Sequence, residues 1–479
     1  RLIPIKLFFN SLDFAIFLPI VFIVYWFITN RNLKLQNFII VLASYVFYGW
    51  WDWRFLSLII FSTIIDYSIG IRLSKEEKQL KRKILLLTSI GVNLGLLGFF
   101  KYFNFFIESF NAAFASAGIH TNMSSLNIIL PVGISFYTFQ TMSYTIDIYR
   151  NKIEHTKSIL AFMAFVSFFP QLVAGPIERA SHLLPQFLKN RKFDYKQASS
   201  GIKLIVWGFF KKVVIADNAA QLVNEIFKNY PNESYISLIV GAILFAFQIY
   251  CDFSGYSDIA IGLGRILGFD LTYNFKFPYF SSNIREFWNR WHISLSSWFR
   301  DYIYIPLGGN KVSQYRVLFN TFCVFVLSGF WHGANWTFVF WGFLHALFFM
   351  PIILLRDRFP KENFSMNIKR ISFIFANFGL VCLAWVFFRA ENIQDAFLYL
   401  RQIFTLTGGQ NTFMKTNTYL LMTIITGVGI LVLLALELRT LMRRKDEIQF
   451  SSIGLITIVL LILFFGAFKN QADFIYFQF

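Results

Sequence analysis

The sequence predicts an all-α, polytopic integral membrane protein. Hydrophobic residues make up 56% of its 479 residues and charged residues only 15%, whereas a soluble chain carries about a quarter charged residues. Long apolar stretches recur along the whole chain, and the Lys and Arg residues behind its net charge of +18 gather in short clusters between them. The positive-inside rule produces this pattern in cytoplasmic loops, so we attribute the charge to membrane topology and expect no nucleic-acid partner.

The first half of the chain contains a series of apolar stretches that we interpret as membrane spans. They cover residues 14–28, 37–49, 55–71, 84–106, 159–173 and 205–219, and another begins at 237. No small-residue cleavage site follows the first stretch, so we expect a retained span. A weaker region, 126–148, contains Pro131 and Gly133, which predict a bent or re-entrant element. The polar, basic segment 182–203 predicts interfacial helices.

The second half adds an apolar run at 317–354 and further spans near 371–388, 419–438 and 453–468. The total is roughly ten to twelve spans. The basic segments 74–83 and 439–445 are expected in the cytoplasm, which places the N-terminus outside. Neither a soluble domain nor a low-complexity linker interrupts the pattern, so the sequence predicts a single membrane domain over residues 1–479.

His332 lies inside the apolar run 317–354. A titratable imidazole in a membrane span costs free energy unless another group satisfies it, and such residues often mark functional sites. Gly329 and Gly333 flank this histidine and are expected to leave room for an approaching group. Trp336 is expected one helical turn further on, on the same face. A core histidine that is hydrogen-bonded to a neighbouring helix remains an equally good interpretation.

A second polar region precedes this run. In a continuous helix, Arg285, Asn289, His292 and Ser296 share one stripe, and Trp288, Trp291, Leu295 and Trp298 share the adjacent one. Such a helix lies at the membrane interface or turns its polar face towards a cavity in the bundle. Further upstream, Asp252, Ser254 and Tyr256 directly follow an apolar stretch.

Several chemistries are excluded by the motifs that the sequence lacks. It contains no HExxH motif and no pair of histidines at i and i+4, so a metal site is not expected. It also contains no GxSxG elbow and no P-loop. The remaining histidines suit proton removal from a hydroxyl that attacks an acyl carbonyl. Tryptophan-rich, dry surroundings would protect a thioester from water.

These motifs carry a resemblance that covers nearly the whole chain. The stretches concerned are FNSLDFAIFLPIVF from Phe9, GPIER from Gly175, CDFSGYSDIAIGLG from Cys251, REFWNRWHISLSSWFRDYIYIPLGGN from Arg285, FWHGANWTFVFWG from Phe330 and the terminal FIYFQF. The chain resembles the membrane-bound O-acyltransferase family, and within it the bacterial branch typified by the alginate O-acetylation membrane protein.

The resemblance implies helices arranged around a central tunnel, with His332 as the catalytic histidine and His292 as the second site residue. The donor and acceptor tunnel is expected to include Arg285, Asn289, Trp288, Ser296, Trp331, Asn335, Trp336, Asp252, Ser254 and Tyr256. His345 is expected to be structural.

The resemblance also implies a reaction. An acyl group, which we expect to be acetyl, passes from a cytoplasmic thioester such as acetyl-CoA to a hydroxyl of an extracytoplasmic polysaccharide. No tightly bound cofactor is implied. A secreted or membrane-tethered partner is expected to complete delivery, and the enzyme is expected in the lipid of the bacterial cytoplasmic membrane.

Two other functions fit a polytopic chain with buried polar groups. One is a transporter or flippase for a secreted glycan, and the other is an assembly scaffold. A transporter more often shows an internal repeat with broken helices, and the sequence shows no such repeat by inspection.

Overall fold

The computed structural model describes residues 9–29, 31–119, 121, 123–172, 175–355, 367–468, 472, 474 and 475. Every regular element in these residues is a helix, and one isolated β-bridge pairs Glu233 with Gln410. The all-α prediction is therefore confirmed. We predicted on which side of the membrane the N-terminus lies, but this terminus is outside the described residues. The last four residues of the FIYFQF motif are also outside them.

The chain divides into two compact units, which are described separately. Unit 1 comprises Arg1–Leu204 and Ile259–Thr272. Its helices are α1 Leu12–Ile23, η1 Val24–Ile28, α2 Leu33–Asp52, η2 Trp53–Phe55, α3 Leu56–Lys75, α4 Gln79–Leu97, η3 Gly98–Tyr102, α5 Phe103–Ser116, α6 Ile134–Tyr149, α7 Ile159–Ser167, α8 Phe169–Leu172 and α9 Ala180–Phe187. Two further helices, α10 Tyr195–Phe209 and α12 Tyr235–Ile266, contribute residues to both units.

Unit 2 comprises Ile205–Asp258 and Tyr273–Phe479. Its helices are η4 Phe210–Ala216, α11 Asp217–Lys228, η5 Tyr230–Asn232, η6 Pro278–Phe280, α13 Ile284–Arg290, α14 Ile293–Phe299, η7 Arg300–Tyr304, α15 Gln314–His332, α16 Trp336–Leu354, α17 Ile368–Arg389, α18 Ile393–Phe404, α19 Thr412–Lys415, α20 Asn417–Met442 and α21 Ser452–Phe465. Several of the helices begin after an Asn or Ser that accepts a backbone hydrogen bond, as Asn283 does for α13 and Ser451 for α21.

By length and apolar composition, six helical stretches within the described residues are able to cross a membrane. They are Leu33–Lys75, Gln79–Ser116, Tyr235–Ile266, Trp336–Leu354, Ile368–Arg389 and Asn417–Met442, and Leu12–Ile28 and Ser452–Phe465 are shorter apolar helices. The chain is thus a polytopic membrane protein. The total of ten to twelve spans and the single membrane domain stay predictions.

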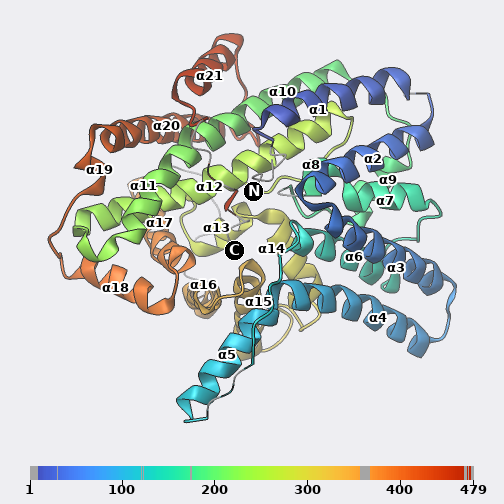
Figure 1. The fold of residues 1–479 in the computed structure, drawn as a ribbon, viewed down its shortest axis with the longest axis horizontal. Coiled ribbons are helices and arrows are strands. Elements are labelled where there is room, and N and C mark those ends of the chain that lie inside the picture. The colour runs from blue at the N-terminus through green and yellow to red at the C-terminus, as the bar shows by residue number, and fades with distance from the viewer. Residues whose placement is uncertain are drawn as a thin grey trace. The chain divides into compact units, whose positions relative to one another are not determined.

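In unit 1, a polar network joins α3, α4 and α6, which lie side by side (Figure 1). Asp66 on α3 is fully buried and accepts hydrogen bonds from Ser89 Oγ at 2.6 Å and Asn93 Nδ2 at 2.8 Å. Thr141 on α6 donates to Asn93 Oδ1 at 3.1 Å. A carboxyl group in a membrane-spanning helix needs such partners because no water is present to solvate it.

In unit 2, the apolar run 317–354 forms a helical hairpin and not one span. Helix α15 ends at His332, α16 begins at Trp336, and the two helices pack against each other (Figure 1). The prediction that Trp336 shares a face with His332 is wrong, because the helix ends between them, and Trp336 is 55% exposed. The prediction that the flanking glycines leave room for a substrate is also wrong.

The space beside both glycines is filled by α16. A β-carbon on Gly329 would collide with the Phe338 carbonyl oxygen and lie 3.3 Å from the Gly342 Cα. A β-carbon on Gly333 would collide with the Phe338 ring. Small residues at such positions let helix backbones approach closely within a membrane. The glycines therefore hold the hairpin together at the level of His332.

We predict that Gly329→Ala destabilises the protein by about 1–3 kcal/mol, the usual cost of an overpacked core. The measurement is the unfolding temperature of the purified protein in detergent. Gly379→Ala on α17 is the control, because a β-carbon there meets nothing within 4 Å. A Gly329→Ala protein with wild-type stability and reduced activity would instead support the substrate-space interpretation.

The GPIER motif of unit 1 forms a small ionic cluster outside the six candidate spans. Glu178 is fully buried and accepts hydrogen bonds from the Thr272 backbone N–H at 2.6 Å and the Thr272 hydroxyl at 3.0 Å. His182 Nδ1 lies 2.8 Å from Glu178 Oε2, and His182 Nε2 lies 3.8 Å from Asp270 Oδ2. The Asp270 and Glu178 carboxylates together raise the pKa of His182 to about 10.

This raised pKa predicts a pH-dependent contribution to stability. The contribution is complete below pH 6.5, the usual pKa of histidine, and it is lost as the pH rises to about 10. The difference in unfolding temperature between wild type and His182→Gln should therefore shrink between pH 6 and about pH 10. His155 lies outside this cluster, so the difference in unfolding temperature between wild type and His155→Gln should show no such trend. A pH-independent difference for His182→Gln would show that the histidine is not charged in the folded protein.

Candidate active site

The predicted continuous helix through Arg285 and Ser296 is broken in the structure. Helix α13 ends at Arg290, and His292 adopts φ 43° and ψ 54° before α14 begins. Few residues other than glycine adopt this left-handed conformation, and such strain persists only where the surroundings hold it. Here Asn274 holds it. Its carbonyl accepts from the Ile293 N–H at 2.9 Å, and its Oδ1 accepts from the Ser294 hydroxyl at 2.6 Å.

The break turns His292 away from the predicted polar stripe and towards His332. The two imidazole rings come from separate segments, and their centroids are 6.4 Å apart. Both side chains are buried, with 0% and 3% of their surface exposed. Phe253 packs edge-on against His292 at 4.7 Å. The two catalytic candidates are therefore brought together by the fold.

Aromatic rings enclose His332. Trp331 and Trp341 lie 5.1 Å from its ring, and Phe388 lies at 5.4 Å. These neighbours come from α15, α16 and α17, so three helices contribute to the enclosure. Water is largely excluded from such surroundings, which suits a group that must be kept from hydrolysis.

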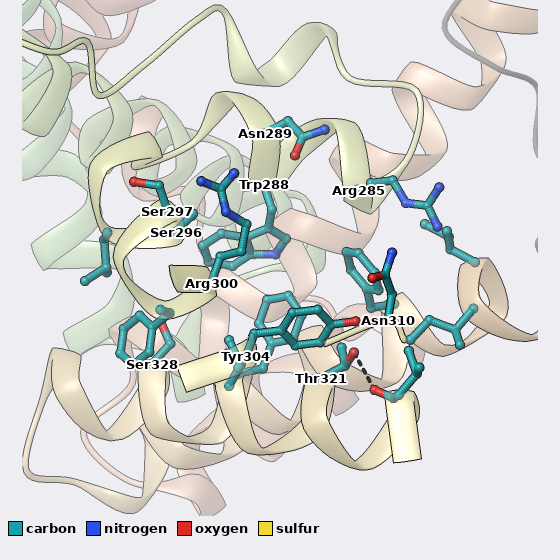
Figure 2. A pocket seen from close by; sticks show the side chains of 18 of the residues that line it. Arg285, Trp288, Asn289, Ser296, Ser297, Arg300, Tyr304, Asn310, Thr321 and Ser328 are labelled. Atoms are coloured by element: carbon teal, nitrogen blue, oxygen red, sulfur yellow. Dashed lines mark hydrogen bonds between the residues drawn. The ribbon is translucent and has the colours of Figure 1, made fainter. Parts of the chain in front are cut away.

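A cavity of about 970 Å³ lies in unit 2, and residues of α13, α14 and α15 are among those that line it (Figure 2). Four residues of the predicted tunnel line it, namely Arg285, Trp288, Asn289 and Ser296. Its other polar lining residues, which the sequence analysis did not single out, are Ser297, Arg300, Tyr304, Asn310, Gln314, Thr321 and Ser328. The cavity is large enough for a drug-sized ligand.

Two residues of the cavity wall connect it with the surroundings of His332. Ser328 lines it and lies one turn before His332 on α15, so the two side chains share a helix face. Trp288 also lines it, and its ring lies 5.8 Å from Trp341, which in turn contacts His332. In Figure 2, Ser328 and Arg285 lie at opposite sides of the cavity. The cavity thus has one end near the catalytic candidates and a basic residue at the other.

His345 supports the cavity wall. It is fully buried, and its Nδ1 accepts a hydrogen bond from Trp288 Nε1 at 3.3 Å. This contact fixes the orientation of the indole that separates the cavity from Trp341. The position agrees with the structural role that was expected for His345.

The charge of the cavity is positive. Arg285 and Arg300 line it, and no acidic residue is among its described lining residues. The neighbouring acid Glu286 is buried and engaged by Arg290 at 2.5 Å and Arg370 at 2.6 Å. Its charge is therefore compensated outside the cavity. Because Arg300 also pairs with Asp301 at 2.8 Å, the attraction for an anionic ligand rests mainly on Arg285.

The other predicted tunnel residues do not line this cavity. Asp252 forms an ion pair with Lys212 at 2.7 Å, and Lys212 also pairs with Asp217 at 2.8 Å. Ser254 accepts a hydrogen bond from Lys211 Nζ at 3.0 Å. These charges are buried, so the network satisfies groups that would otherwise be costly in the interior.

Tyr256 packs against Phe474 with 4.4 Å between the ring centroids. Trp331 contacts both histidine rings. Asn335 accepts from the Thr337 N–H at 3.0 Å and donates to the Glu391 carbonyl at 2.9 Å, so it fixes the turn before α16.

Some of the residues that the sequence analysis missed did carry a signal. Arg300 and Tyr304 continue the spacing of four residues from Ser296, and both line the cavity. Asn274 carried no comparable signal, because a single asparagine in a loop is common and its partners come from α14. The contact of Phe253 with His292 could not be predicted either, since the two residues are distant in the sequence.

Comparison with known proteins identifies the family. Residues 148–390 match the model of the membrane-bound O-acyltransferase family. A probable alginate O-acetylase from Pseudomonas putida is 40% identical over 382 residues, which is 80% of this chain and 76% of that protein. A peptidoglycan O-acetyltransferase from Helicobacter pylori is 36% identical over 432 residues, 84% of this chain and 81% of that protein.

A teichoic acid D-alanyltransferase from Bacillus subtilis is 29% identical over 282 residues, which is 55% of this chain and 70% of that protein. The family match and the first two relatives each cover the region that contains both histidines and the cavity. The chain is an acyltransferase enzyme that belongs to the membrane-bound O-acyltransferase family.

Proposed function

We propose that this enzyme transfers an acetyl group from a cytoplasmic thioester to a hydroxyl of an extracytoplasmic polysaccharide. The observation that carries the proposal is a buried pair of histidines, His292 and His332, the latter one helical turn from Ser328 in the wall of a cavity that Arg285 also lines. The acetyl group is favoured because the relatives with the higher identity are named O-acetylase and O-acetyltransferase. The D-alanyl relatives are more distant.

The cavity suits a thioester donor with a phosphorylated carrier. Arg285 supplies positive charge for the phosphate groups of acetyl-CoA or of a carrier-bound pantetheine, and Arg300, which also pairs with Asp301, adds a second guanidinium. The apolar lining residues, among them Phe325, Phe349 and Val324, suit the remainder of the carrier arm. The donor is a substrate in this proposal, and no tightly bound cofactor is required.

In the proposed reaction, His332 acts as a general base. It removes the proton from the acceptor hydroxyl while that oxygen attacks the thioester carbonyl. The new C–O bond replaces the C–S bond, and the proton passes from His332 to the departing thiolate. His292 lies close enough to orient either His332 or a reacting group, and its strained backbone indicates that its position matters.

We also propose the wider setting that the family resemblance implies. The whole chain works as one membrane domain in the bacterial cytoplasmic membrane, with residues 74–83 and 439–445 in the cytoplasm and the N-terminus outside. A secreted or membrane-tethered partner then completes delivery to the glycan. A transporter or scaffold role would require glycan movement or assembly without acyl transfer, which a labelled acyl thioester distinguishes.

We predict that His332→Ala lowers the rate of acyl transfer by roughly a hundred- to ten-thousand-fold, the usual contribution of a positioned general base. The measurement is transfer from a radiolabelled acetyl thioester to glycan in membranes or proteoliposomes. Expression and unfolding temperature should change little.

His345→Gln is the comparison, because glutamine keeps an acceptor for the Trp288 N–H and should retain most activity. An intact His332→Ala protein that transfers acetyl at close to the wild-type rate would refute the proposed base. Loss of activity in both variants would point instead to a shared structural cause.

A second prediction concerns the donor cavity. Arg285→Gln should raise the KM for the acetyl thioester, with a smaller change in kcat, because the lost charge contacts the carrier and not the reacting atoms. Steady-state kinetics over a range of donor concentrations measure this effect. Arg316→Gln removes the same charge from an exposed position that does not line the cavity, so its KM should stay near wild type. Equal KM values for both variants would argue against donor binding at Arg285.

A further inference from the structure

A second cavity lies on unit 1, between the ends of two membrane-capable stretches. It has a volume of about 410 Å³ and is lined by Arg72, Lys75, Glu76, Lys81, Ile84 and Leu85. The first three of these residues belong to the end of α3 or directly follow it, and the last three belong to the first turns of α4. The reaction proposed above does not use any of them.

The cavity is basic and open to its surroundings. It carries three cationic side chains against one carboxylate, and Glu76 lies 3.9 Å from Lys81. Arg72 and Lys75 are exposed, and 61% of the Lys81 side chain is exposed. This arrangement leaves an excess of positive charge where a membrane-spanning segment meets the headgroup region.

The turn that carries these cations is held rigidly by a different residue. Arg82 donates hydrogen bonds to the Leu73 carbonyl at 2.5 Å and to the Tyr149 carbonyl at 2.9 Å. It therefore caps the ends of both α3 and α6. Because Arg82 performs this structural role, the backbone that carries the cavity residues is fixed without help from a ligand.

An exposed apolar stripe continues from the cavity along α4. Leu80, Ile84 and Leu87 are 71%, 54% and 55% exposed, and their spacing places them on one helix face. Exposed leucine and isoleucine on a membrane-spanning helix face acyl chains. The basic cavity and this apolar stripe meet at Ile84, which contributes to both.

We propose that this cavity binds the headgroup of an anionic phospholipid. The phosphodiester lies among Arg72, Lys75 and Lys81, and one acyl chain follows the stripe along α4. Basic pockets beside membrane-spanning helices recognise anionic lipids by this combination of charge and apolar contact. A free phosphate satisfies only the charges, and a nucleic acid or acidic peptide leaves the apolar stripe without a partner.

The test measures lipid binding by the purified full-length protein. Native mass spectrometry counts bound phosphatidylglycerol and phosphatidylcholine from mixed detergent micelles, and the unfolding temperature is followed in the same titration. We expect phosphatidylglycerol to bind in preference and to raise the unfolding temperature. The double variant Lys75→Gln/Lys81→Gln should lose about thirtyfold in apparent affinity, since each of the two basic residues near the surface contributes roughly 1 kcal/mol.

The matched control is Lys78→Gln/Lys83→Gln. It removes the same charge from the same turn, but neither residue lines the cavity, so binding should stay near wild type. Lys75→Arg/Lys81→Arg should also bind, which separates loss of charge from loss of folding. An equal loss in the control variant, or equal binding of phosphatidylcholine, would overturn the proposal in favour of diffuse attraction. Equal stabilisation by inorganic phosphate would overturn it in favour of a free-phosphate site.

Discussion

The active site depends on the close contact between α15 and α16 at Gly329 and Gly342. Their backbones approach so closely that a β-carbon on either residue would collide with the opposite helix. Helix α15 ends at His332, directly after this contact, and Trp341 of α16 lies against the imidazole. A looser crossing would separate the ring from its aromatic enclosure. Helix packing and chemistry therefore share one constraint, which is the absence of side chains at the crossing.

Satisfying buried polar groups is the second requirement on this fold. Neutral hydrogen-bond donors surround Asp66 in unit 1, whereas ion pairs satisfy Glu178 in unit 1 and Asp252 in unit 2. In both cases a partner at hydrogen-bond distance offsets part of the cost of burying the carboxyl group. These paired groups differ from the basic residues of the large cavity. Groups in these networks have partners, whereas Arg285 lines a cavity that is large enough for a ligand.

The cavity and the pair of histidines divide the proposed work between them. Arg285 and Arg300 provide charge where the donor carrier is expected to bind, while His292 and His332 lie in surroundings made mainly of aromatic rings. Trp288 separates the two regions and is held by His345. Such a division suits acyl transfer, because the donor is recognised by its carrier and the reactive carbonyl is kept away from water.

Composition and motifs by themselves determined the fold class, the family and the choice of His332 and His292. A membrane-spanning helix can be predicted from its own residues, since each helix must satisfy its own backbone hydrogen bonds within the membrane. The sequence also predicted Arg285, Trp288, Asn289 and Ser296, all of which line one cavity.

Only the tertiary structure decided which residues meet. The left-handed turn at His292 depends on Asn274, whose contact with α14 no local pattern shows. The glycines beside His332 looked like open space in the sequence, yet a second helix fills it. Asp252 and Ser254 looked like site residues, but distant lysines pair with them. In each case the deciding partner is remote along the chain, and local periodicity carries no information about such contacts.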